Sequence, residues 1–129
     1  MKKQALSVTP SVTAGFPTPA GDYLETPLDL NELLIQHPAA TFFVRVSGDS
    51  MVGVGIHDGD LLVVDRSLEP ISGKIVIAIV NGELTVKQLL CRNNQISLLA
   101  ANEQYAAIDI KDGSEFEIWG VVVHVIHKL

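Results

Sequence analysis

Apolar and polar positions follow a short-period pattern along most of the chain, from Thr41 to its end. Short runs that alternate or are continuously apolar, and that are rich in β-branched and aromatic residues, predict strands. The expected strands cover residues 42–46, 61–65, 74–80, 83–90, 96–99, 108–110 and 116–126. Asn81-Gly82 is a strong hairpin signal, and Asn93-Asn94 marks another turn. The pattern therefore predicts a mainly β fold, as a folded sheet or a partly closed barrel.

Residues 1–40 have a different pattern. Prolines recur at positions 10, 17, 19, 27 and 38. Because proline discourages helix and interior strand, this segment is predicted to be an extended, mobile N-terminal arm. The exception is residues 29–35, where Asp29 can cap a short helix, Glu32 follows three residues later, and Pro38 stops it. We therefore expect an arm over residues 1–40 and a β-rich domain over residues 41–129.

Composition and charge narrow the class of protein. The chain has 129 residues, of which 47% are hydrophobic, so one compact domain can form a core without disulfides. Its single cysteine, Cys91, suits a reducing cytoplasm. The formal net charge is −6, with no basic run beyond Lys2-Lys3. DNA-binding proteins usually carry a basic patch, so direct sequence-specific DNA binding is not expected, and any role in DNA metabolism would run through protein partners.

The sequence also gives an expectation about membranes. Met1-Lys2-Lys3 could open a signal peptide, but the apolar segment that should follow is interrupted by Ser, Thr and Pro. The longest apolar runs, residues 75–80 and 121–123, are too short to span a bilayer. We therefore expect a soluble, cytoplasmic protein with no membrane association.

Candidate chemistry centres on Ser50 and Lys87. Ser50 lies in Ser-Gly-Asp-Ser-Met, where Gly48 lets the backbone turn and expose the hydroxyl. Taken singly, the serine reads as part of a polar turn, and Lys87 as an outward-facing lysine on a returning strand. If Lys87 instead faces an apolar site, desolvation lowers its pKa, and the neutral amine can take a proton from Ser50. Serine–lysine pairs are an established variant of the serine nucleophile.

Other residues offer alternatives. A Ser-His-Asp triad through His57 and a catalytic Cys91 are both open interpretations. The set Asp49, Asp58, Asp60 and Asp65 could suggest a cation site, although turn chemistry explains it more simply. His124 and His127 lie three apart on an expected strand, so they should face opposite sides and not share a metal. No metal and no cofactor are expected.

Several motifs, taken in order, resemble those of one family. They are Ala14-Gly15-Phe16-Pro17, residues 28–38, Ser47 to Met51, residues 56–65, and Gly82 to Lys87. Together they are similar to a UmuD-type protein of the LexA-like self-cleaving serine peptidases (peptidase family S24). The likeness covers the chain from about Gly15 to Leu129. It implies a fold like the C-terminal domain of LexA.

The resemblance assigns roles to residues. It implies that Ser50 is the nucleophile, that Lys87 is the general base, and that the cut falls between Ala14 and Gly15. UmuD-type proteins often have Cys-Gly at this site, whereas Ala-Gly is usual in the repressor relatives. Backbone N–H groups of Ser50 or Met51 are the expected oxyanion donors.

The resemblance also implies a cellular role. In the family, the RecA–single-stranded DNA filament stimulates cleavage in the SOS response to DNA damage. The shortened homodimer then assists a UmuC-type Y-family polymerase in error-prone translesion synthesis. Two alternatives stay open: a non-catalytic polymerase-accessory interaction module, and a relative of the signal peptidases.

Overall fold

The structure, a computed structural model, describes residues 6–8, 12, 14–17 and 26–129. Its contacts divide the chain into two units, Met1–Gln36 and His37–Leu129. Lys2, Lys3, Pro10 and Pro19, which entered the predictions above, lie outside the described residues. The mobility of the arm and the boundary at residue 40 stay predictions.

The described residues of the first unit form two short strands and one helix. β1 (Leu6–Val8) and β2 (Thr26–Leu28) pair in antiparallel fashion, with Ser7 opposite Pro27. The helix α1 (Leu30–Leu34) begins after Asp29, whose side chain accepts a hydrogen bond of 2.9 Å from the N–H of Asn31. The predicted short helix with an Asp29 cap is therefore confirmed. The pairing of β1 with β2 was not anticipated.

The second unit is built on one antiparallel sheet of seven strands, in the order β3-β4-β9-β5-β6-β7-β8. These are β3 (Thr41–Arg45), β4 (Leu61–Asp65), β5 (Ile75–Val80), β6 (Glu83–Arg92), β7 (Gln95–Leu99), β8 (Ile108–Ile110) and β9 (Phe116–Ile126). Two 3-10 helices, Pro38–Ala40 and Val52–Val54, precede β3 and β4. Asn81 and Gly82 adopt φ of 50° and 83° between β5 and β6, as the hairpin prediction requires.

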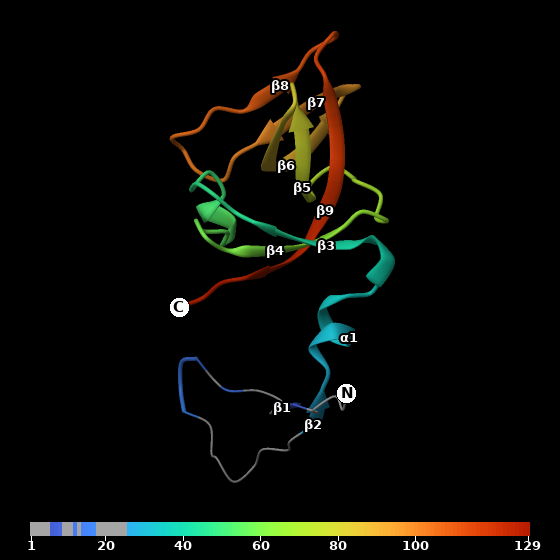
Figure 1. Cartoon of the computed structure of the whole chain (residues 1–129). Coiled ribbons are helices and arrows are strands. Elements are labelled where there is room, and N and C mark those ends of the chain that lie inside the picture. The colour runs from blue at the N-terminus through green and yellow to red at the C-terminus, as the bar shows by residue number, and fades with distance from the viewer. Residues whose placement is uncertain (1–5, 9–11, 13, 18–25) are drawn as a thin grey trace. The chain divides into compact units, whose positions relative to one another are not determined.

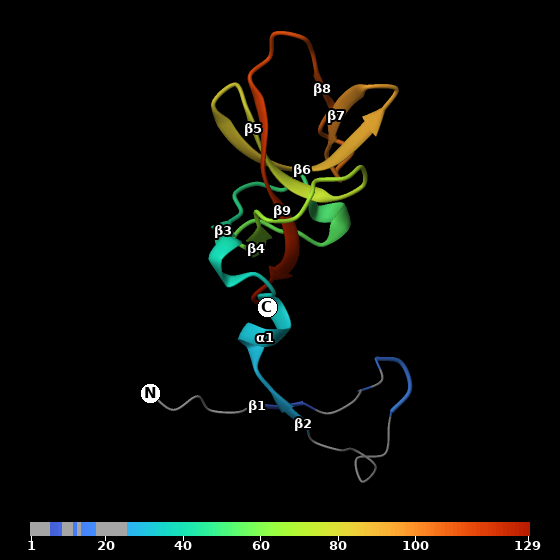
Figure 2. The ribbon, with the colours of Figure 1, turned by 90° about the vertical axis from the view of Figure 1, so that its right-hand side faces the viewer.

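The sheet folds along its longest strand, β9. The last part of β9, from Val121, pairs with β4, whereas its first part, up to Val121, pairs with β5 (Figures 1 and 2). Register shifts occur in both pairings, and bulges of this kind bend a strand and increase its twist. Gly120 lies at this bend, where an added Cβ would come within 2.6 Å of Val64. The sheet is therefore folded and open, with β3 and β8 as its outer strands.

Each half of the folded sheet has its own buried cluster. One contains Val46, Met51, Ile56, Leu62, Val64 and Ile77. The other contains Val76, Ala78, Leu89, Leu98 and Val121. β5 contributes to both clusters because alternate side chains of a strand point to opposite faces. The mainly β prediction is confirmed, and no helix among the described residues is long and apolar enough to cross a membrane.

Candidate active site

Ser50 lies on a tight loop between β3 and the 3-10 helix at Val52–Val54. Gly48 has φ of 97°, a left-handed conformation that glycine adopts at little cost, and its N–H donates a 2.8 Å hydrogen bond to Asp58 Oδ1. Met51, which follows Ser50, is only 1% exposed and belongs to the first buried cluster. The loop is thus fixed on both sides of Ser50, and the tight turn expected at Gly48 is present.

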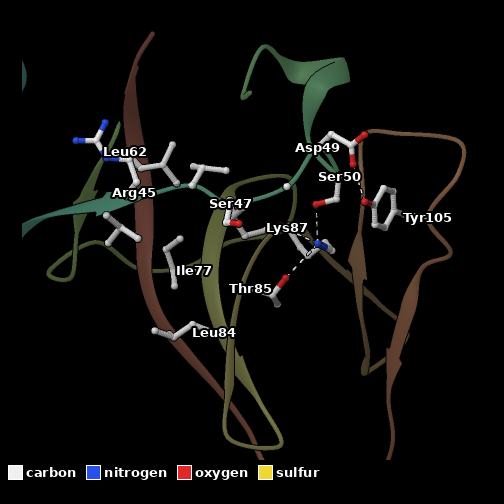
Figure 3. A pocket seen from close by; sticks show the side chains of 14 residues that line it. Arg45, Ser47, Asp49, Ser50, Leu62, Ile77, Leu84, Thr85, Lys87 and Tyr105 are labelled. Carbon is white, nitrogen blue, oxygen red and sulfur yellow. Dashed lines mark hydrogen bonds between the residues drawn. The ribbon is translucent and has the colours of Figure 1, made fainter. Parts of the chain in front are cut away.

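Lys87 comes from β6, in the interior of the sheet between β5 and β7. The residue is 7% exposed, so the outward-facing alternative is wrong. Its ammonium group donates three hydrogen bonds: to Ser50 Oγ at 2.9 Å, to Thr85 Oγ1 at 3.0 Å and to the carbonyl of Val86 at 3.1 Å. Thr85 lies two residues away on the same strand and therefore faces the same side (Figure 3). The structure brings Ser50 and Lys87 together.

The burial of Lys87 affects the pKa of its side chain. Burial lowers the pKa of the ammonium group below its usual value, because an apolar surrounding disfavours the charged state. Among the described residues, no carboxylate forms an ion pair with Lys87 that would counteract this effect. A neutral amine 2.9 Å from a hydroxyl can accept its proton and activate the oxygen as a nucleophile.

The pair borders a cavity of about 390 Å³. Its lining includes apolar side chains from four strands: Val44, Leu62, Ile77, Leu84 and Val86. The lining also includes the polar loop from Ser47 to Ser50, together with Arg45, Thr85 and Tyr105 (Figure 3). A cavity that combines apolar side chains with a serine hydroxyl and a lysine of lowered pKa has the properties of an active site.

A segment that sequence analysis did not single out holds the Ser50 loop in place. The N–H of Ala101 donates to the carbonyl of Ser50 at 2.8 Å, and the side-chain amide of Asn102 donates to the carbonyl of Asp49 at 3.0 Å. Tyr105 donates its hydroxyl to Asp49 Oδ1 at 2.6 Å, and this hydrogen bond raises the pKa of the tyrosine (Figure 3). Asn102 and Tyr105 lie more than fifty residues beyond Asp49, so no local pattern could have indicated these contacts.

The remaining predicted site residues have different surroundings. Ala14 and Gly15 are exposed and belong to the first unit. His57 packs against His127, with ring centroids 4.8 Å apart, whereas the nitrogen bonded to Ser50 Oγ is that of Lys87. Cys91 is exposed. The structure therefore gives no support to a triad through His57 or to a catalytic cysteine.

The four aspartates considered as a cation site have separate partners. Asp58 and Asp60 accept hydrogen bonds from the backbone N–H groups of Gly48 and His57, and Asp49 accepts from a tyrosine. Asp65 accepts from Ser67 and is paired with His37. The hydrogen bonds from Ser67 and His37 hold the pKa of the Asp65 carboxyl below its usual range.

Comparison with known proteins identifies similar chains. The model of the Peptidase S24-like family matches residues 6–123. The chain is 51% identical to Protein SamA of Salmonella typhimurium, over 89% of this chain and 79% of that protein. It is 48% identical to Protein MucA of Escherichia coli, over 88% of this chain and 77% of that protein. It is 41% identical to the LexA repressor of Pectobacterium carotovorum, over 91% of this chain and 58% of that protein.

Proposed function

Because this chain belongs to the peptidase S24-like family, we propose that it is a serine endopeptidase that cuts its own Ala14–Gly15 bond. The family prediction made from the spaced motifs is confirmed. The observation that carries the proposal is the 2.9 Å hydrogen bond between the buried amine of Lys87 and the hydroxyl of Ser50. A lysine in this setting is suited to act as a general base.

The proposed reaction has two stages. Neutral Lys87 takes the Ser50 proton while Oγ attacks the carbonyl carbon of Ala14, and a backbone N–H of Ser50 or Met51 stabilises the oxyanion. The intermediate collapses to an acyl-enzyme, and Lys87 returns the proton to the leaving amine of Gly15. Water, deprotonated by Lys87, then attacks the ester carbonyl. Its proton returns to Ser50 Oγ through Lys87, which leaves Ala14 with a free carboxylate.

The substrate bond is covalently tethered to the proposed enzyme. Because a tether makes the reaction intramolecular, it can lower the reaction barrier by roughly 7–11 kcal/mol when the geometry is favourable. Ala14 and Gly15 are exposed, and their small side chains allow a close approach to a nucleophile. Cleavage then has to be controlled. We propose that the competent pose is rarely populated and that an activator raises its population.

The proposed cellular role follows from the family. The activator is the RecA–single-stranded DNA filament of the SOS response, and the protein acts in the cytoplasm. The fragment that begins at Gly15 forms a homodimer and serves as an accessory subunit of a UmuC-type translesion polymerase. The net charge of −6 supports contacts with proteins rather than with DNA. Exposed apolar side chains on β9, such as Val125 and Ile126, are consistent with a contact between copies.

The test is self-cleavage of the purified chain, followed by mass spectrometry of the products with and without RecA filament. The wild type should release a fragment that begins at Gly15. Ser50→Ala and Lys87→Ala should leave the chain uncut, whereas Lys111→Ala, which changes an exposed lysine, should not alter the rate. If either site variant still releases the fragment at the normal rate, the assignment is wrong. If the folded wild type is never cut, the chain is a non-catalytic accessory module.

A further inference from the structure

Three side chains outside the proposed active site form a compact group. Asp60 ends the turn before β4, His57 lies three residues earlier in that turn, and His127 directly follows β9. The β4–β9 register pairs Leu61 with Ile126, so the next positions along, Asp60 and His127, are neighbours across the strands. Backbone pairing and a tight turn therefore bring together residues that are distant in the sequence.

The geometry leaves a fixed carboxylate between two imidazoles. Asp60 is 2% exposed, and its Oδ2 accepts a 2.8 Å hydrogen bond from the N–H of His57. Its Oδ1 lies 2.5 Å from Nδ1 of His127, and Nδ1 of His57 is 3.7 Å from Oδ2. The side chains of His57 and His127 are 49% and 44% exposed. The carboxylate is thus held by the fold, while both rings are accessible from solvent.

Both oxygens of the buried Asp60 carboxyl are engaged in hydrogen bonds. A buried carboxyl with an imidazole on each side places three possible metal ligands together.

We propose that His57, Asp60 and His127 bind a divalent zinc-class ion. Two imidazole nitrogens and one carboxylate oxygen are a ligand set that suits Zn²⁺ and similar transition metals. The candidate ligand atoms lie within 4.8 Å of one another. Zinc bonds of about 2.0–2.2 Å require tetrahedral ligand atoms roughly 3.4 Å apart, so the two half-exposed rings must turn while Asp60 stays in place.

The ion would replace the hydrogen bond between His127 and Asp60. Their 2.5 Å contact is a hydrogen bond, and metal binding requires these ligands to be deprotonated. Ca²⁺ and Mg²⁺ should not compete, because they prefer several oxygen ligands and only one carboxylate is present. With three protein ligands, a fourth position is left for water.

The chain offers an internal control. His37 Nδ1 lies 2.6 Å from Asp65 Oδ2, which is the same histidine–carboxylate contact. Among the described residues, however, the only group of three possible ligands is that of His57, Asp60 and His127. A single imidazole beside a carboxylate should bind zinc far more weakly than two. His37→Ala is therefore the matched control for a variant of either proposed ligand.

Calorimetric titration of the full, untagged chain with ZnCl₂ tests the site. We expect one ion per chain, a higher melting temperature with zinc, and no response to MgCl₂ or CaCl₂. His57→Ala and His127→Ala should each weaken zinc binding by at least about 10–100-fold. Mutation of a residue that only hydrogen-bonds to a metal ligand already has an effect of this size, and loss of a ligand itself should have a larger one. Their exposed rings can be removed without opening the core. His37→Ala should bind like the wild type.

Two results would overturn the site. One is a wild-type chain that takes up no zinc. The other is zinc uptake that both ligand variants retain unchanged, which would mean adventitious surface binding. Replacing Zn²⁺ with Co²⁺ adds an optical readout, because ligand-field absorption should appear in the wild type and in His37→Ala and be lost in His127→Ala. The outcome is independent of self-cleavage, so failure here leaves the proposed peptidase function untouched.

Discussion

The proposed general base makes a specific prediction for the effect of Thr85 on the pH dependence of cleavage. Thr85 Oγ1 accepts a 3.0 Å hydrogen bond from the Lys87 ammonium group, and so favours the charged form. Thr85→Val replaces that acceptor with a methyl group of similar size. The pKa of Lys87, already lowered by burial, should fall further. The two other acceptors, Ser50 Oγ and the carbonyl of Val86, remain.

The size of the shift follows from hydrogen-bond energies. A hydrogen bond to a charged group contributes about 1.5–3 kcal/mol, and a neutral one about 0.5–1.5 kcal/mol. Thr85→Val removes the extra stabilisation of the charged form of Lys87, which is roughly 1 kcal/mol. This loss lowers the pKa of Lys87 by a little under one unit. A lysine of ordinary pKa is neutral in about one molecule in 2,500 at pH 7, and each unit of lowering raises that fraction tenfold. At pH values below the pKa of Lys87, Thr85→Val should therefore cleave itself up to about tenfold faster than the wild type.

The assay measures the rate of appearance of the Gly15 fragment from pH 6 to pH 11, with circular dichroism to check folding. The wild-type rate should rise about tenfold per pH unit and level off below pH 10.4, the ordinary lysine value. The levelling point should move down in Thr85→Val and stay in place in Thr85→Ser, which keeps the acceptor. A flat wild-type profile, or a levelling point that does not move in Thr85→Val, would refute a lysine base in this site.

Three further changes test the surroundings of the site. Tyr105→Phe removes the hydrogen bond to Asp49 and should slow cleavage about three- to tenfold, since such a bond contributes ~1 kcal/mol; an unchanged rate would contradict this role. Gly53→Ala places a Cβ 2.6 Å from the carbonyl oxygen of Ala101, and denaturant titration should show about 1–3 kcal/mol less stability. Asp65 has a lowered carboxyl pKa in the folded state, so its stabilising effect is present above about pH 4 and lost as the pH falls further. Urea titrations at pH 3 and pH 7 should differ less for Asp65→Asn than for the wild type.

Local patterns in the sequence determined the secondary structure. Apolar runs predicted all seven strands of the large sheet to within a few residues. Burial of one face of a strand requires apolar residues at alternate positions, and burial of both faces requires a continuous apolar run. Asn81-Gly82 specified its hairpin through the left-handed conformation of both residues. Asp29 likewise marked the start of α1. Each of these features depends on a few consecutive residues.

Family membership was also present in the sequence, since several spaced motifs together predicted it and comparison with known proteins confirmed it. The motifs did not establish whether the side chain of Lys87 is buried or exposed. Taken by itself, a lysine on a strand is more often exposed, and only the position of β6 inside the sheet buries its amine beside Ser50. Strand alternation predicts that Thr85 and Lys87 lie on the same face of β6, but it does not say whether that face is buried.

Tertiary structure alone decided the contacts between distant segments. Tyr105 reaches Asp49 across 56 positions, and His127 reaches Asp60 across 67. The sequence prompted a comparison of His127 with His124, its neighbour in the chain, whereas its partners in space are His57 and Asp60. The physical reason is strand register. Backbone hydrogen bonds between β4 and β9 fix which residues lie side by side. The periodicity of a strand indicates which face a residue occupies, but it does not by itself name the residue opposite on a strand far away in the sequence.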